Sequence, residues 1–238
     1  MVLLWCLWLL GSWLVVRWQD SSGRVDRWML LASAVGLMAA WPTVRLSQVR
    51  RPAGRLGTRP GALAARLRRR WRLMEVAVEW LCLALVFQAV VWPLSFVAGW
   101  GLAQTLWLNV AMVAWSAVTA ALVGWGCLFM GGAGRTVMLA ACLLLLVGEP
   151  AVLALTAWPG EGGWGVSPLP TLWALSASAE EVVLEPWQWH AAGMAGAALV
   201  AWLLLMAAAR WVTPRVDVEA GGGKVQDLGF EVRENARP

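Results

Sequence analysis

The sequence predicts an all-α protein, a polytopic transmembrane helix bundle of about six spans, and three observations carry this prediction. Hydrophobic residues make up 60% of the 238 residues and charged residues only 14%, whereas about a quarter of a soluble domain is normally charged. The apolar residues gather in long runs, and a run of about 20 suffices to cross a hydrocarbon layer roughly 30 Å thick. Many of the 20 tryptophans lie at the ends of these runs, where the indole ring favours the level of the lipid headgroups.

Six apolar segments define the spans in chain order. They cover residues 1–16, 28–44, 76–100, 102–130, 136–158 and 187–209. Together they form one transmembrane domain over residues 1–212, and the polar remainder over 213–238 is predicted to be a flexible tail. No basic residue precedes the first segment and no small-residue cleavage site follows it, so we interpret it as a retained helix. It is short for a span, and the first two segments could instead form a shallow re-entrant hairpin.

The basic residues predict the orientation, because cytoplasmic loops are enriched in Lys and Arg. Ten arginines lie between Arg45 and Arg72, one lies at Arg135, and five basic residues follow from Arg210 onward. A cytoplasmic location of both termini therefore places 16 of the 19 basic residues inside the cell. The other three, Arg17, Arg24 and Arg27, fall in a loop assigned to the outside. We expect a multi-pass protein of the bacterial inner membrane.

The Arg-rich connection before the third span predicts an amphipathic helix along the cytoplasmic interface. Its apolar residues recur at spacings of three and four, at Leu63, Leu67, Trp71, Met74 and Val78. Its basic residues are Arg66, Arg68, Arg69, Arg70 and Arg72. Attraction to anionic lipid, at about 1 kcal/mol per basic residue, is one explanation of the charge, and docking of a cytosolic partner is the other. Nucleic acid is not an expected partner, because no binding motif accompanies the charge.

Glu149 and Pro150 form the most informative polar feature within a predicted span. A carboxylate near the middle of a span is costly, so we expect Glu149 to face other helices or a wet cavity, or to stay protonated. Pro150 lacks a backbone donor and frees a carbonyl one turn earlier, which a protonated Glu149 could satisfy. A polar pathway or a break in the helix is the functional alternative. By contrast, Glu75 and Glu79 are expected to pair locally with Arg72 at the interface.

Two further patterns concern assembly. Small residues recur every fourth position at Ser116, Ala120 and Gly124, and again at Gly193, Ala197 and Ala201. Such stripes let helix backbones approach closely, within the bundle or between subunits. In the loop over 159–186, residues Leu169 to Leu184 could form a short helix on the outer surface.

The sequence carries no recognisable catalytic constellation, so we expect no enzyme activity, no metal and no cofactor. Gly221–Lys224 does not match a phosphate-binding loop, because Val225 follows the lysine. A bis-histidine haem cannot be built within a chain whose single histidine is His190. The four cysteines lie inside apolar runs, which is typical of small buried hydrophobic residues.

The chain resembles the membrane subunit of ABC exporters of the type-2 permease class. The six-span layout with both ends inside is similar, as is the hairpin of segments 102–130 and 136–158. The stretch Val166-Ser167-Pro168-Leu169-Pro170-Thr171 resembles the Ser-Pro or Asn-Pro stretch before that family's last span, and Ala207-Ala208-Ala209-Arg210-Trp211 resembles its exit into a basic tail. The family's amphipathic helix before the first span has no counterpart here.

The resemblance implies a transport permease that assembles with a further membrane subunit, identical or not, and is energised by a separate cytosolic ATPase. The alternative is a non-catalytic integral subunit that anchors or assembles a larger membrane complex. A nucleotide-binding partner that co-purifies with the chain would distinguish the two.

Overall fold

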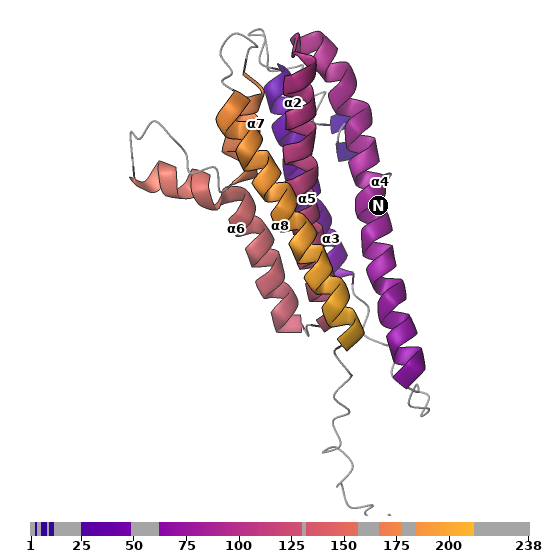
Figure 1. The fold of residues 1–238 in the computed structure, drawn as a ribbon. Coiled ribbons are helices and arrows are strands. Elements are labelled where there is room, and N and C mark those ends of the chain that lie inside the picture. Colours follow the sequence, from indigo (N-terminus) through magenta and orange to yellow (C-terminus); the bar gives the residue numbers. More distant parts are fainter. Residues whose placement is uncertain are drawn as a thin grey trace, which may run out of the picture.

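A computed structural model describes residues 25–48, 62–129, 132–156, 167–177 and 184–211, with a few positions between Leu3 and Gly11. Every regular element in this part of the chain is a helix, which confirms the all-α class (Figure 1). Five helical stretches are long and apolar enough to cross a membrane. These are Arg27–Ser47, Arg69–Ala98, Leu102–Phe129, Gly132–Val152 and Pro186–Arg210. They match the second to sixth predicted spans, whereas most of segment 1–16 and all of the tail 213–238 lie outside the described residues.

The second predicted span is one continuous helical rod of three elements. The α-helix α2 (Val25–Val35) passes into a π-helical turn, η1 (Gly36–Ala40), and then into α3 (Trp41–Ser47). Pro42 cannot donate a backbone hydrogen bond, and its ring clashes with the carbonyl four residues earlier. The preceding turn is widened instead, so that the Trp41 N–H reaches the Gly36 carbonyl. The span therefore continues past its proline.

Helix α4 (Ala62–Ala98) joins the Arg-rich segment and the third span in one helix of 37 residues. The predicted turn between an interfacial helix and the span is not present in the structure. The predicted apolar stripe of α4 faces outward, because its members Leu67, Trp71, Met74 and Val78 are all exposed. The first turns of α4 extend beyond the ends of the neighbouring helices (Figure 1). The segment is thus a basic extension of a spanning helix with its apolar face turned away from the bundle.

A tight hairpin connects α4 to α5 (Leu102–Phe129). Gly99 adopts a positive φ of 68°, and the Trp100 N–H donates to the Ser95 carbonyl at 3.0 Å. This is the glycine-dependent termination by which helix carbonyls are commonly satisfied. The third span accordingly ends at Ala98, two residues before the predicted boundary.

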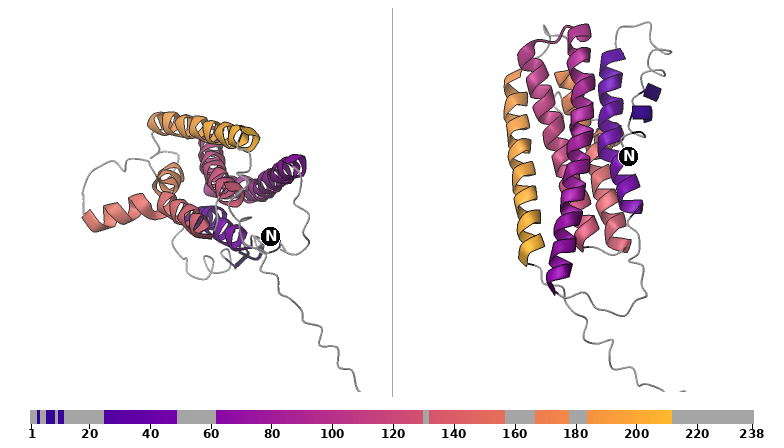
Figure 2. Two further views of the ribbon diagram at one scale, coloured as in Figure 1. Left: turned by 90° about the horizontal axis from the view of Figure 1, so that it is seen from below. Right: turned by 90° about the vertical axis from the view of Figure 1, so that its right-hand side faces the viewer.

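Helix α5 is the centre of the bundle (Figure 2). It packs against α4, α8 (Leu184–Trp211), α6 (Gly132–Thr156) and α7 (Pro168–Leu175). Its polar side chains point inward, with Gln104, Thr105, Asn109, Ser116 and Thr119 all buried. In its most apolar stretch of 18 residues, 67% is buried inside the protein, against 11% for the corresponding stretch of α6 and 17% for that of α8. The outer helices therefore present most of their apolar surface to the surroundings of the bundle.

Within the bundle the small-residue stripe of α5 is a packing face, whereas that of α8 faces outward, so packing between subunits stays a prediction for α8. Ser116, Ala120 and Gly124 are buried within the bundle. On α8, Gly193 and Ala197 are exposed, and α8 instead packs through residues such as Ala191, Ala198 and Leu205.

Candidate functional site

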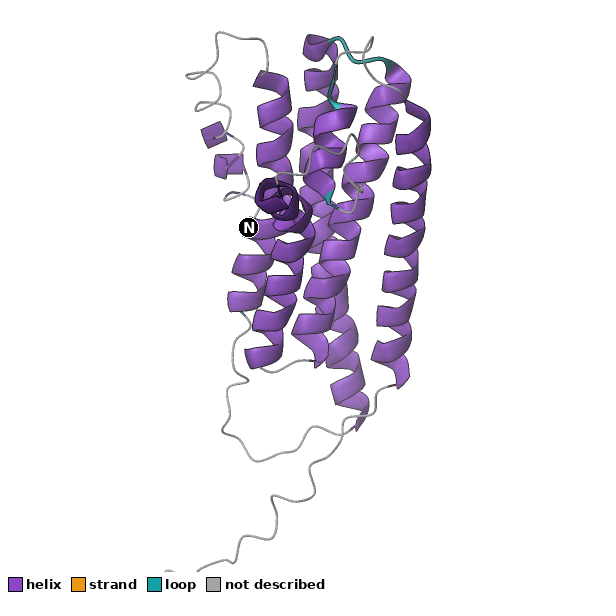
Figure 3. Ribbon diagram, turned by 90° about the vertical axis from the view of Figure 1, so that its left-hand side faces the viewer, coloured by secondary structure: helices purple, strands orange, loops and turns teal. Residues whose placement is uncertain are grey.

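The candidate site lies at the bend of α6. α6 rises from the lower end of the bundle and then bends, so that its last turns project sideways (Figure 1). Seen from that side, these turns point toward the viewer near mid-height (Figure 3). Pro150 lies inside α6, and a proline both removes a hydrogen bond and clashes with the preceding turn. The proline is therefore the physical cause of the bend.

Ser167 hydrogen-bonds both to the carbonyl that Pro150 frees and to the carboxylate of Glu149. Its hydroxyl donates to the carbonyl of Leu146 at 2.7 Å, and Leu146 is the residue four positions before Pro150. Its backbone N–H donates to the Glu149 carboxylate, with 2.7 Å between N and Oε2. The sequence predicted a freed carbonyl one turn before Pro150 and suggested Glu149 as its partner. The structure assigns that carbonyl to Ser167, and Glu149 accepts a bond from the same residue.

Ser167 is positioned by the start of α7. It is the N-cap residue of this eight-residue helix, with extended backbone angles, and Pro168 follows at the first helical position. Proline suits that position because the first N–H groups of a helix have no intrahelical partner. Thr171 Oγ1 donates to the Ser167 carbonyl at 3.0 Å and closes the first turn. A carboxylate at a helix N-terminus is favoured by the helix dipole, so Glu149 also stabilises this end of α7.

The other end of α7 is held by donors from two different helices. The Gln104 amide of α5 donates to the carbonyls of Leu175 and Ala177, at 2.7 and 2.8 Å. Arg27 of α2 donates to the Ser176 carbonyl at 3.1 Å, and its guanidinium lies 5.3 Å from the centre of the Trp173 ring. A cation near a helix C-terminus complements the dipole. Arg27 is one of the three basic residues in the loop that the sequence analysis assigned to the outside. Its contacts with α7 give a physical reason for a basic residue there.

The helix predicted on the outer surface is thus present but differs in place and length. It covers Pro168–Leu175 rather than Leu169 to Leu184, and Thr171, Leu172 and Leu175 are fully buried. It packs against α2, α5 and α6 inside the bundle (Figure 1). An isolated helix of eight residues is unstable in itself, so α7 depends on the contacts at its two ends.

His190 adds an imidazole to this region. Its ring lies between Trp115 of α5 and Trp187 of α8, with 6.2 Å between ring centroids in both pairs. The buried atoms His190 Nε2 and Trp115 Nε1 have no hydrogen-bond partner among the described residues. Within the same residues no group of His, Cys, Asp and Glu could hold a metal ion. Chemically, the groups at this site can donate and accept hydrogen bonds.

The predicted basic residues lie away from this break. The ring of Phe129, at the end of α5, lies 6.0 Å from the guanidinium of Arg69. Arg70 is exposed and Arg72 half-buried, whereas Arg66 and Arg68 belong to α4 with side chains outside the described part. The structure therefore holds the two predicted sites, Glu149–Pro150 and the arginines, in separate parts of the bundle.

The sequence suggested that Glu75 and Glu79 pair with Arg72. In the structure both pair instead with an arginine of another helix. Arg45 of α3 binds both carboxylates, each at 3.1 Å. This pairing joins α3 to α4 across the 49–61 connection. Sequence spacing could not reveal it, because the two partners are 30 residues or more apart.

Comparisons of the chain with protein-family models, with curated proteins and with solved structures find no match. The fold and the site therefore define the class: within the described residues the chain is all-helical, with five helices able to cross a membrane, one of which is bent and contains Pro150.

Sequence reasoning found Glu149 and Pro150 but missed their partner. Ser167 belongs to a Ser-Pro pair ahead of an apolar run, which is itself a signal for a helix start. That signal would have placed a helix at 168, although not its position against α6. Gln104 and Trp115 gave no signal, because polar and aromatic residues are scattered through all the apolar runs.

Proposed function

We propose that the chain is the integral permease subunit of an ABC-type transporter in the bacterial inner membrane, energised by a separate cytosolic ATPase. The observation that carries the proposal is the start of α4. There an Arg-rich helix extends beyond its neighbours and exposes both charge and apolar surface (Figure 1). A helix end of this kind offers a cytosolic protein cationic anchors next to the membrane. The resemblance to type-2 permeases supports the same assignment.

The charge distribution supports an orientation with this end in the cytoplasm. Arg45 ends α3, Arg69, Arg70 and Arg72 begin α4, Arg135 begins α6 and Arg210 ends α8. These helix ends gather at one end of the bundle (Figure 1). Under the positive-inside rule that end of the bundle faces the cytoplasm, and we propose that both termini face it too. A first span over 1–16 completes six spans in this proposal, and the start of α4 meets the cytoplasmic interface.

The orientation is tested by labelling two matched alanines. Ala103 is exposed beside the α4–α5 hairpin and Ala133 is exposed in the first turn of α6, at opposite ends of the bundle. In a chain whose four cysteines are replaced by alanine, a membrane-impermeant maleimide should label Ala103→Cys from outside intact cells. Ala133→Cys should react only after the membrane is opened. The reverse pattern contradicts the proposed orientation.

The partner is tested by purifying the chain from its native membrane in mild detergent. Arg66, Arg68, Arg69, Arg70 and Arg72 are each replaced by Gln, with Arg210→Gln as a control on another helix at the same end. A protein contact predicts that one or two positions dominate the loss of a nucleotide-binding subunit, because desolvated anchors carry most interface energy. The control should retain the subunit.

Attraction to anionic lipid predicts a different pattern. Each charge removed, Arg210 included, then has a similar and salt-screened effect on membrane association. If no nucleotide-binding protein co-purifies with the unaltered chain, the permease proposal fails. The chain would then be better described as a subunit that anchors or assembles a larger membrane complex.

A further inference from the structure

Val76 is the first buried residue of α4 among the described side chains, because none of those between residues 67 and 75 is buried. The first turns of α4 also extend beyond the ends of the neighbouring helices (Figure 1). Before Val76, the guanidinium of Arg69 lies 6.0 Å from the centre of the Phe129 ring, at the end of α5. The direction in which this basic end points therefore depends on the contacts of α4 close to Val76.

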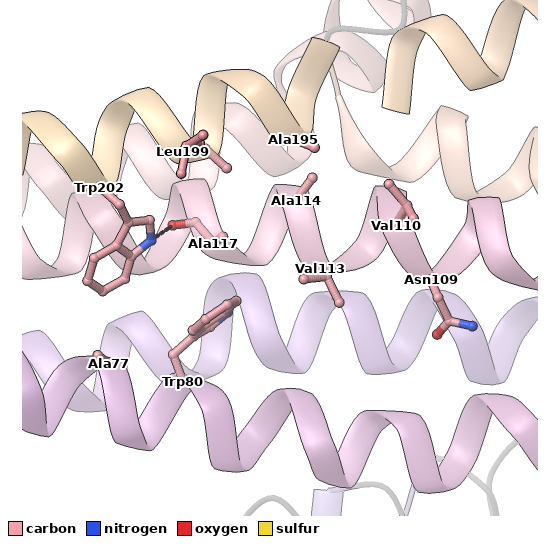
Figure 4. A pocket seen from close by; sticks show the side chains of 11 residues that line it. Ala77, Trp80, Asn109, Val110, Val113, Ala114, Ala117, Ala195, Leu199 and Trp202 are labelled. Atoms are coloured by element: carbon pink, nitrogen blue, oxygen red, sulfur yellow. Dashed lines mark hydrogen bonds between the residues drawn. The ribbon is translucent and has the colours of Figure 1, made fainter. Parts of the chain in front are cut away.

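On the side of α8, α4 receives little lateral support. A groove of about 540 Å³ lies between α4, α5 and α8, with Asn109 of α5 in its lining (Figure 4). Beside it the ring centroids of Trp80 and Trp202 lie 6.2 Å apart, and Trp80 donates its indole N–H to Ser116 Oγ of α5 at 3.0 Å. Both α4 and α8 contact α5 far more than they contact each other. Helix α5 is therefore the main support of α4 here.

On the side of α3, an arginine bridges the gap to α4. One terminal nitrogen of Arg45 binds Glu75 Oε2 and the other binds Glu79 Oε1, each at 3.1 Å. The two glutamates are four residues apart, so they lie on one face of α4, one turn from each other. In the described part of the chain the backbones of α3 and α4 hardly approach each other. The bridge is therefore made by long side chains rather than by close helix packing.

Arg45 stands on a well-packed corner of the bundle. The next residue, Leu46, is buried. A Cβ added at Gly126 of α5 would lie 2.9 Å from Leu46 Cδ2 and 3.3 Å from Met138 Cβ of α6, so these three helices are in close contact. The Arg45 side chain is only 19% exposed, and water and salt therefore screen its ion pairs less than those of a surface pair.

Removal of the guanidinium would leave two carboxylates without their cation. Like charges four residues apart on a helix repel each other. Glu79 is the less exposed of the two, and its Oε2 is buried without a hydrogen-bond partner among the described residues. A partly buried carboxylate that loses its cation is destabilised, and movement of α4 away from α3 would return it to water. Arg45 therefore holds α4 in an orientation that the two glutamates alone would not favour.

We propose that Arg45 is a positioning residue, which holds the start of α4 at a fixed angle through Glu75 and Glu79. It thereby presents the exposed side chains of Arg70 and Trp71 to the cytosolic partner. The identity of that partner rests on the proposed function, whereas the effect on α4 concerns this chain alone. Arg45 itself makes no contact with the partner and acts through α4.

The first measurement is a distance between spin labels on α3 and α4, at Ser47→Cys and Leu67→Cys. Both positions are exposed, and the four native cysteines are replaced by alanine. Pulsed electron paramagnetic resonance on the purified chain in lipid nanodiscs should give one narrow distance distribution. Arg45→Gln should broaden this distribution and move it to longer distances, because α4 is released from α3.

Three variants separate positioning from loss of fold. Arg45→Glu combined with Glu79→Arg keeps the net charge and lets the new arginine pair with Glu75 and with the new glutamate, so the narrow distribution should return. Glu75→Gln removes one ion pair at an exposed position and should broaden the distribution less than Arg45→Gln does. Arg210→Gln removes an exposed cation from α8 at the same end of the bundle and should leave the distribution unchanged.

The second measurement is the amount of nucleotide-binding subunit that stays with the chain purified from its native membrane. Arg45→Gln should lower this amount roughly threefold to tenfold, because apparent affinity falls with the fraction of chains whose α4 is correctly oriented. The charge-reversed pair should restore most of it, and Arg210→Gln should not change it.

The two measurements distinguish the possible failures. A distance distribution that Arg45→Gln leaves unchanged overturns the inference, even if the subunit is lost. A broadened distribution that the charge-reversed pair does not restore overturns it as well, because ion pairing is then not the cause. A broadened distribution with full retention of the subunit shows that the direction of α4 does not govern partner binding. Absence of any nucleotide-binding subunit from the unaltered chain overturns the proposed function instead, and the distances alone then decide whether Arg45 positions α4.

Discussion

Helix α7 and the α5–α8 contact are two packing regions of the same bundle that are stabilised in opposite ways. α7 has eight residues, and polar groups from α2, α5 and α6 bind its two ends. The contact of α5 with α8 joins two helices of 28 residues, and Gly124 of α5 lies directly against Leu205 of α8. In a short helix most backbone N–H and C=O groups lie in the first or last turn and have no partner within the helix, whereas a long helix pairs most of its own backbone groups.

This difference shows where polar residues are needed inside an apolar bundle. In a membrane no water can satisfy free N–H and C=O groups, so a break in a helix must bring its own partners. Ser167 and Glu149 do this at the break of α6. Two unbroken helices need only a close fit, which small residues allow. The first region should therefore be sensitive to the loss of a polar atom, and the second to the addition of volume.

The largest effect is expected for Glu149→Leu. This change removes the acceptor of the Ser167 N–H and should lower the free energy of unfolding by about 2–3 kcal/mol, as for a hydrogen bond to a charged group. Glu149→Gln keeps an acceptor oxygen and should cost less than about 1 kcal/mol. Unfolding in mixed detergent–SDS micelles measures both values. If Glu149→Leu is fully stable, and supports the cell as well as the unaltered chain does, then the carboxylate is merely tolerated there.

A smaller effect is expected for added volume at Gly124. A Cβ at this position would lie 2.7 Å from Leu205 Cδ2, and Leu205 is fully buried. Gly124→Val should therefore cost about 1–3 kcal/mol, which is typical of overpacking. At Gly196, on the outward face of α8, a new Cβ meets nothing within 4 Å, so Gly196→Val should stay within about 0.5 kcal/mol. Equal losses in the two variants, measured as above, would mean that backbone effects rather than close packing dominate this contact.

The sequence by itself determined the all-α class and the apolar helices. The second to sixth segments reappear as helices, with boundaries shifted by a few residues except at the start of the third, where α4 begins at Ala62 instead of residue 76. Hydrophobic length is a local property of the chain. The sequence also singled out Glu149 and Pro150, since a carboxylate and a proline inside an apolar run are conspicuous without any partner. These conclusions need no knowledge of which helices are neighbours.

The tertiary structure alone decided which groups meet. Ser167 serves Glu149 from 18 residues away, and Gln104 reaches α7 from more than 70 residues away. Arg45 forms ion pairs with Glu75 and Glu79, for which the sequence suggested Arg72. The groove at Asn109 requires three helices at once. The hydropathy of an apolar helix does not show which helices are its neighbours: α5 is central and α8 peripheral, yet their mean hydropathies are similar, at 1.8 and 2.0. Their places are set by side-chain fit and by the few polar groups that must find partners.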